Sequence, residues 1–144
     1  MDNLYDAMVD VESGGNPLAA SIKGARGLMQ VTQPALTDYN KSNKTTLTMD
    51  DLWNEKTNRQ VGEWYMGYQI PRMLRAIRVQ DNAENRLWAY NAGIGNVMKG
   101  RKPRETVYYI RKVRERLVGG EKNDGGRKYR GNKGESTQNS NSTK

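Results

Sequence analysis

The chain contains neither cysteine nor histidine, and this absence limits both what can hold a fold together and what chemistry it can perform. Disulfide frameworks, thiolate nucleophiles, zinc sites built from cysteine and histidine, and serine–histidine–aspartate triads are all excluded. A fold of these 144 residues must therefore rest on the packing of apolar residues, which make up 35% of the chain. Any acid–base catalysis falls to Asp, Glu, Lys or Tyr.

Charge is unevenly distributed along the sequence. Residues 1–69 carry six Lys and Arg against nine Asp and Glu, whereas residues 70–144 carry 18 against seven, so the net charges are −3 and +11. A basic half favours an anionic partner such as nucleic acid, a membrane surface or an acidic cell-wall polymer, although solvated helix faces would look the same. No interleaving of basic and aromatic residues points to a specific nucleic acid. No segment approaches the roughly 20 apolar residues of a membrane span.

The spacing of apolar residues predicts a mainly α-helical chain, because no long alternating strand pattern occurs. The last 26 residues contain six glycines and only one large apolar residue, Tyr129, so they cannot bury enough surface to offset the entropy of ordering. We therefore expect a folded domain over residues 1–118 and a flexible tail over residues 119–144. Helices are expected over residues 3–12, 57–69, 71–79, 83–92 and 104–118.

The first predicted helix ends in a carboxyl group. Its apolar stripe, which includes Tyr5 and Met8, continues to Glu12, and a dense run of helix breakers follows at residues 13–17. A buried carboxyl either finds partners or has its pKa raised and stays protonated. A protonated Glu beside an open loop is what a general acid requires. The spacing also allows Glu12 to face solvent at the end of the helix.

Two further segments combine glycine with polar side chains. Residues 24–30, Gly-Ala-Arg-Gly-Leu-Met-Gln, let the backbone pass close to a ligand, and Gln30 adds an amide. A tight turn explains this segment as well, and a phosphate loop is excluded because no Lys-Ser/Thr pair follows. Residues 89–93, Ala-Tyr-Asn-Ala-Gly, suit stacking on a sugar and hydrogen bonding to it, although a core Tyr with an Asn near a helix end explains them nearly as well.

In their order and spacing, these segments resemble the soluble lytic transglycosylase family. The resemblance implies a lysozyme-like, goose-type helical fold with a glycan-binding cleft, peptidoglycan glycan strands as the substrate, and neither a cofactor nor a metal. It extends from Leu4 to Val118 and rests on Glu12-Ser13-Gly14-Gly15-Asn16-Pro17, Ser21, residues 24–30, Thr57-Asn58, residues 89–93, and Glu105-Thr106 followed by Tyr109-Ile110.

The resemblance also implies roles for individual residues. Glu12 falls on the catalytic acid, and Tyr109 falls on the aromatic residue that hydrogen-bonds the catalytic carboxyl. Helical spacing independently turns Tyr109 inward and Tyr108 outward. Ser21 falls on a serine near the reacting sugar, and Trp88 stands where the family has a small residue, which would reshape the groove. The glycan-groove positions are Met29, Gln30, Tyr90 and Asn91.

The reaction implied by the resemblance uses one carboxyl group where glycosidases generally use two. It cleaves the β-1,4 bond between N-acetylmuramic acid and N-acetylglucosamine and leaves a 1,6-anhydromuramic acid end. One alternative is a lysozyme-type hydrolase, whose second carboxyl would be Asp38, Asp50, Asp51 or Glu55. Another is a basic wall-binding or virion structural protein without catalysis, which the presence of Glu12 disfavours.

The N-terminus is acidic and interrupted by polar residues, which is not typical of a signal peptide. A wall-cutting domain with such a start fits a bacteriophage protein that is made in the cytoplasm and acts on the cell wall or in the periplasm. Association with the virion, and partners among virion or envelope proteins, are expected on the same ground.

Overall fold

The computed structural model describes the backbone of residues 2–125 and the side chains of residues 3–119. This part of the chain is mainly helical, as the sequence predicts, and contains no strand. Two isolated β-bridges, Ala20 with Arg26 and Arg26 with Val31, shape one loop. The elements are α1 (Asp2–Ser13), α2 (Gln33–Asn43), the 3₁₀-helix η1 (Met49–Trp53), α3 (Glu55–Trp64), the π-helix η2 (Tyr65–Gln69), α4 (Ile70–Ala76), α5 (Ala83–Ala92), α6 (Ile94–Met98) and α7 (Arg104–Gly125).

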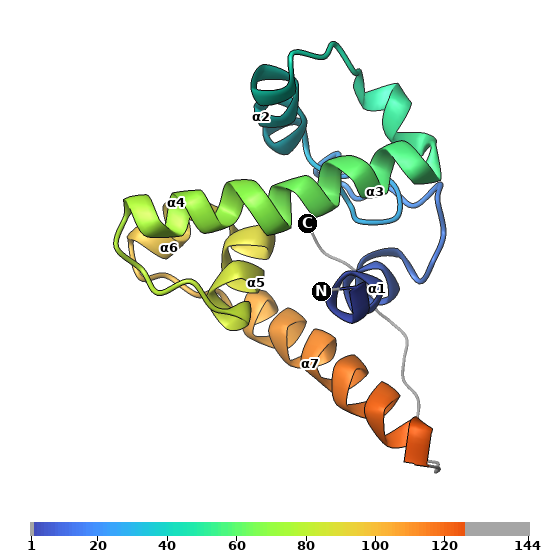
Figure 1. The fold of residues 1–144 in the computed structure, drawn as a ribbon, viewed down its shortest axis with the longest axis vertical. Helices are drawn as coiled ribbons and strands as arrows, with labels where there is room; N and C mark the ends of the chain where they lie inside the picture. The colour runs from blue at the N-terminus through green and yellow to red at the C-terminus, as the bar shows by residue number, and fades with distance from the viewer. Residues whose placement is uncertain (1, 126–144) are drawn as a thin grey trace.

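A continuous helical rod made of α3, η2 and α4 runs through the fold, with α2 on one side of it and α1, α5 and α7 on the other (Figure 1). α1 packs against α7, and an ion pair between Asp10 and Arg116 joins the two helices. The core lies between these elements. Its fully buried side chains include Met8 of α1, Met66 of the rod and Leu87 of α5.

The rod corrects the prediction of two helices separated at Pro71. A proline inside an α-helix lacks an N–H donor, and its ring crowds the carbonyl four residues earlier. Residues 65–69 instead form a π-helical turn, in which the backbone N–H of Ile70 donates to the carbonyl of Tyr65. This wider turn lets the chain pass through Pro71 without ending the helix.

Other helix ends differ less from the prediction. α5 begins and ends where the sequence indicates, whereas α4 ends at Ala76 rather than Val79. α7 continues past Val118 to Gly125. The domain boundary at Val118 stays a prediction, and residues 126–144 of the expected tail lie outside the described residues. Within residues 2–125, no helix has both the length and the apolar character that a membrane crossing needs.

α2 and η1 are absent from the sequence-based prediction, although each has a start signal. Pro34 stands in the first turn of α2, and a capping box joins Thr48 to Asp51 at the start of η1. Both elements are short and contain few apolar residues, so the sequence does not show a helical periodicity there. The buried side chains of α2 are Ala35, Leu36 and Tyr39.

Candidate active site

Glu12 lies buried in the last turn of α1, with 7% of its surface exposed. The helix ends directly after it because Gly14 and Gly15 adopt positive φ angles of 63° and 84°. The backbone N–H of Gly14 donates to the carbonyl of Asp10 at 2.9 Å, which closes the last turn. The apolar stripe predicted for this helix therefore carries a carboxyl group into the interior, and the sequence alternative of a solvent-facing Glu12 is wrong.

Two tyrosines from different helices border Glu12. Tyr90 of α5 and Tyr109 of α7 are 7% and 6% exposed, respectively. Burial raises the pKa of each hydroxyl well above its ordinary value, and the negative charge of Glu12 raises it further. The Tyr109 hydroxyl also interacts with the Glu12 carboxyl itself. The inward direction predicted for Tyr109 is confirmed, as is the outward direction of Tyr108, which is 48% exposed.

The segment of residues 24–30 forms a tight loop that supports Tyr90 from one side. The Tyr90 hydroxyl donates to the backbone carbonyl of Met29 at 2.7 Å. The side chain of Met29 is fully buried and packs so closely against Gly62 that a Cβ there would lie 2.6 Å from the Met29 sulfur. Met29 therefore contributes its backbone to the site, and its side chain is not exposed to a groove.

Gln30 and Ser21 also hold this loop in shape. Gln30 is 3% exposed, has a left-handed φ of 49°, and donates through Nε2 to the carbonyls of Ala19 and Gly27 at 3.1 Å each. The Ser21 hydroxyl accepts from the backbone N–H of Ala25 at 3.0 Å. Ser21 is half-buried, so its hydroxyl proton can still be directed to a ligand.

Asn58 is the side chain that fixes the loop, and sequence reasoning gave it no role beyond the resemblance. Its Oδ1 accepts from the backbone N–H of Met29 at 2.8 Å, and its Nδ2 donates to the carbonyls of Arg26 at 2.7 Å and Leu52 at 3.0 Å. Asn58 is fully buried. Gly27 makes room for it, because a Cβ at that position would lie 2.2 Å from Nδ2.

Asn91 joins α5 to α7 beside the two tyrosines. Its Oδ1 accepts from the hydroxyl of Thr106, which is fully buried, at 2.7 Å. Asn91 itself is half-buried. The structure thus groups Glu12, Tyr90, Tyr109 and the Met29 backbone, while Asn91 lies next to Tyr90 in sequence and braces the helix that carries Tyr109.

A comparison with known protein families bears directly on this arrangement. Residues 1–109, which are 109 of the 144 residues, match the model of the transglycosylase SLT domain. The chain belongs to the transglycosylase SLT family. It is therefore a peptidoglycan lytic transglycosylase, and peptidoglycan is its substrate. The matched region includes Glu12 and extends as far as Tyr109.

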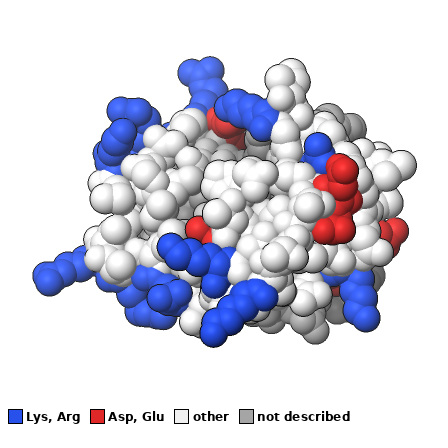
Figure 2. All heavy atoms as spheres, turned by 90° about the horizontal axis from the view of Figure 1, so that it is seen from above, with Lys and Arg blue, Asp and Glu red and all other residues white. Residues whose placement is uncertain are grey.

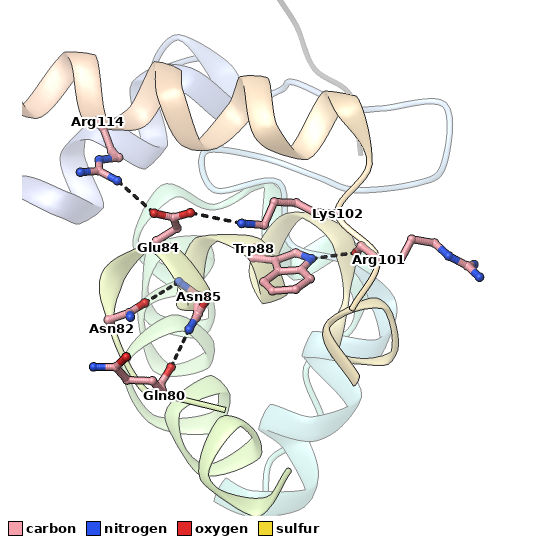
Figure 3. A network of polar contacts seen from close by, with 8 residues as sticks. All are labelled: Gln80, Asn82, Glu84, Asn85, Trp88, Arg101, Lys102 and Arg114. Carbon is pink, nitrogen blue, oxygen red and sulfur yellow. Dashed lines mark hydrogen bonds and ion pairs between the residues drawn. The ribbon is translucent and has the colours of Figure 1, made fainter. Parts of the chain in front are cut away.

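In this SLT domain, Trp88 belongs to a polar network between α5 and α7 (Figure 3). Its indole N–H donates to the carbonyl of Arg101 at 2.9 Å, and the Lys102 ammonium lies 4.6 Å from the centre of its ring. Glu84 pairs with both Lys102 and Arg114 at 3.1 Å. These contacts hold α7 against α5, the two helices that supply Tyr109 and Tyr90.

The other candidate carboxyls of the SLT domain have structural partners or lie at the surface. Asp50 pairs with Arg26 at 2.9 Å, and Asp51 closes the capping box of η1. Glu55 is exposed in the first turn of α3, and Asp38 accepts from Gln69 at 3.3 Å. Among the described residues, no group of three or more acidic side chains is arranged to hold a metal ion.

Proposed function

We propose that this SLT domain cleaves the β-1,4 bond between N-acetylmuramic acid and N-acetylglucosamine and closes a 1,6-anhydro ring on the muramic acid. One observation carries the proposal: among residues 3–119, Glu12 is the only carboxyl side chain that is buried, and it lies against the hydroxyl-bearing rings of Tyr90 and Tyr109. Burial and the negative end of the α1 dipole both disfavour the ionised carboxyl, so we expect the pKa of Glu12 to be raised above its ordinary value.

Glu12 performs two proton transfers in this proposal. The neutral carboxyl first gives its proton to the glycosidic oxygen, and the bond from that oxygen to C1 of the muramic acid breaks. The 2-acetamido group of the same sugar supports the positive charge that develops at C1. The Glu12 carboxylate then removes the proton of the C6 hydroxyl, whose oxygen attacks C1 and closes the ring. Glu12 ends neutral again, and no water enters the product.

Hydrolysis receives less support from the site. A second carboxyl would have to stand near Glu12 to activate water or to attack C1. Asp50 and Asp51 are engaged in loop and helix-end contacts, and Glu55 is exposed. Asp38, the fourth candidate, accepts a hydrogen bond from Gln69. The groups that raise the pKa of Tyr90 and Tyr109, the residues that border Glu12, are Glu12 and neighbouring tyrosines, and none of the four other carboxyls is among them.

The reaction type is tested by the mass of the products. Purified peptidoglycan treated with the protein is expected to release fragments that end in 1,6-anhydromuramic acid, each lighter by one water than the corresponding hydrolysis product. Mass spectrometry of the soluble fraction distinguishes the two. Fragments with reducing ends would move the assignment to hydrolysis and require a second carboxyl.

Tyr109→Phe is expected to slow the reaction without stopping it. Phenylalanine keeps the buried ring but removes the hydroxyl at the Glu12 carboxyl, a loss of roughly 1–3 kcal/mol, or about 5- to 150-fold in rate. Because the hydroxyl stabilises the ionised carboxyl, its removal is also expected to raise the pKa of Glu12 and move the alkaline fall of the pH–rate profile to higher pH. Tyr108→Phe, on the exposed side of α7, is the matched control. Unchanged kinetics and an unmoved profile in Tyr109→Phe would contradict this role.

A further inference from the structure

The rod exposes an aromatic–cation pair that the catalytic proposal does not use. Tyr68 of η2 is 49% exposed, and the guanidinium carbon of Arg72 on α4 lies 5.3 Å from the centre of its ring. A guanidinium over an aromatic face is held flat and in a defined orientation. Within residues 3–119, Arg72 makes no ion pair with a carboxylate, so its charge is available to a ligand.

Gln69 fixes the direction of this guanidinium. Its Nε2 donates to Asp38 of α2 at 3.3 Å, and its Oε1 accepts from Nη1 of Arg72 at 3.2 Å. Because the Gln69 amide donates through its nitrogen and accepts through its oxygen, a flip of the amide that exchanges these two atoms would lose both hydrogen bonds. A guanidinium has five N–H donors. The contact with Gln69 is the one hydrogen bond that the Arg72 side chain makes in the described part of the chain, so the planar fork remains open to an acceptor.

A row of side chains connects this pair to the catalytic acid. Tyr65 of η2 packs edge-on against Tyr90, with ring centres 6.0 Å apart, and Tyr90 borders Glu12. Asp38 acts electrostatically on Tyr65: burial and the charge of that carboxylate raise the pKa of Tyr65 to about 12. Asp38 in turn holds Gln69. A series of side-chain interactions through Tyr90, Tyr65, Asp38 and Gln69 therefore links the pair to Glu12.

The chemistry of the substrate indicates which group Arg72 would bind. A peptidoglycan strand carries short peptides on its muramic acids, and the amino acids of these peptides present carboxylates. Figure 2 shows one face of the molecule with Lys and Arg side chains along much of its edge and mostly uncharged residues in its middle, while a group of Asp and Glu side chains lies at the right edge. The basic part of this edge suits an anionic strand. An open guanidinium fork is the group that matches a carboxylate in both charge and shape.

We propose that Tyr68, Gln69 and Arg72 form a subsite that binds a carboxylate of a peptide stem on the glycan strand. Arg72 makes the contact, Tyr68 supports its flat face, and Gln69, held by Asp38, sets its direction. The subsite rests on the proposed function for its substrate, but it concerns recognition of the peptide and not cleavage of the sugar bond.

The test measures binding to two forms of one ligand. Soluble glycan strands with their peptide stems, and the same strands after enzymatic removal of the stems, are titrated against the full chain carrying Glu12→Gln, which leaves the strands intact. Arg72→Gln is added in this background. Arg78→Gln serves as the control. Arg78 is exposed just beyond the end of α4, and its substitution removes the same charge as Arg72→Gln.

Arg72→Gln is expected to raise the Kd for stem-bearing strands about two- to fivefold, as for the loss of one solvent-accessible ion pair at a defined site. It is expected to leave the Kd for stripped strands unchanged, and Arg78→Gln is expected to change neither. Equal losses on both ligands, equal losses in both variants, or no loss at all would overturn the subsite. Failure of the catalytic proposal would be seen separately, as reducing ends in the products of the unmodified protein.

Discussion

The Glu12→Gln variant is expected to release no soluble fragments from peptidoglycan while keeping its fold. General acid–base catalysis by one side chain is worth roughly 10²–10⁴-fold in rate. Here a single carboxyl is assigned both the first proton transfer and the second, so the loss should lie at or beyond the upper end of that range. Glutamine matches the shape of a protonated glutamate, and the native site is already arranged around a buried carboxyl that is 7% exposed. The midpoint of thermal unfolding should therefore fall little or not at all.

Glu55→Gln is the matched control for this substitution. It makes the same chemical change at an exposed position in the first turn of α3. Both proteins are compared with the unmodified chain by mass spectrometry of released fragments and by thermal unfolding followed by circular dichroism. Substantial residual activity in Glu12→Gln would show that another group supplies the proton. A cooperative transition lost in Glu12→Gln alone would show that Glu12 holds the fold together and would remove the basis for its assignment.

The spacing of apolar residues within single helices was enough to place Glu12 on an apolar stripe and to predict the burial of Tyr109. The 3.6-residue period of α1 carries the apolar stripe to Glu12, and the same period on α7 separates buried Tyr109 from exposed Tyr108. α5 was placed at Ala83–Ala92 for the same reason. Each of these features depends on residues within one or two helical turns of one another, which is the range over which periodicity carries information.

The centre of the site depends on contacts between distant parts of the chain. Residues 24–30 read equally well as a simple turn, because their shape is imposed by Asn58, 32 residues beyond Arg26. The burial of the Met29 side chain likewise depends on the absence of a Cβ at Gly62. The π-helix at residues 65–69 has no local sequence signature apart from the following proline. A signal for Asn58 was present: it lies three residues before Val61 on the inward face of the predicted helix, where an amide must find partners.

Asn58→Ala is expected to lower the free energy of unfolding by about 3–5 kcal/mol, a large share of the roughly 5–15 kcal/mol typical of a domain. The substitution removes three hydrogen bonds and leaves the N–H of Met29 and the carbonyls of Arg26 and Leu52 buried without their partner. An unsatisfied buried group costs about 1–3 kcal/mol, and no water can easily replace a side chain that is fully enclosed. Urea unfolding followed by circular dichroism measures the change.

Asn54→Ala is the control variant for Asn58→Ala. Comparing the two losses in free energy of unfolding shows whether the three hydrogen bonds of Asn58 matter more than the loss of any asparagine from this helix. Asn54 is exposed and caps the same helix, accepting from the backbone N–H of Thr57 at 2.9 Å, so its loss should cost only about 1 kcal/mol. Equal losses in the two variants would mean that packing alone shapes the loop of residues 24–30. The larger loss in Asn58→Ala would mean that the amide is what holds the Met29 carbonyl under the Tyr90 hydroxyl. In that case, any Asn58→Ala protein that stays folded should also turn over more slowly, because Tyr90 would no longer be fixed beside Glu12.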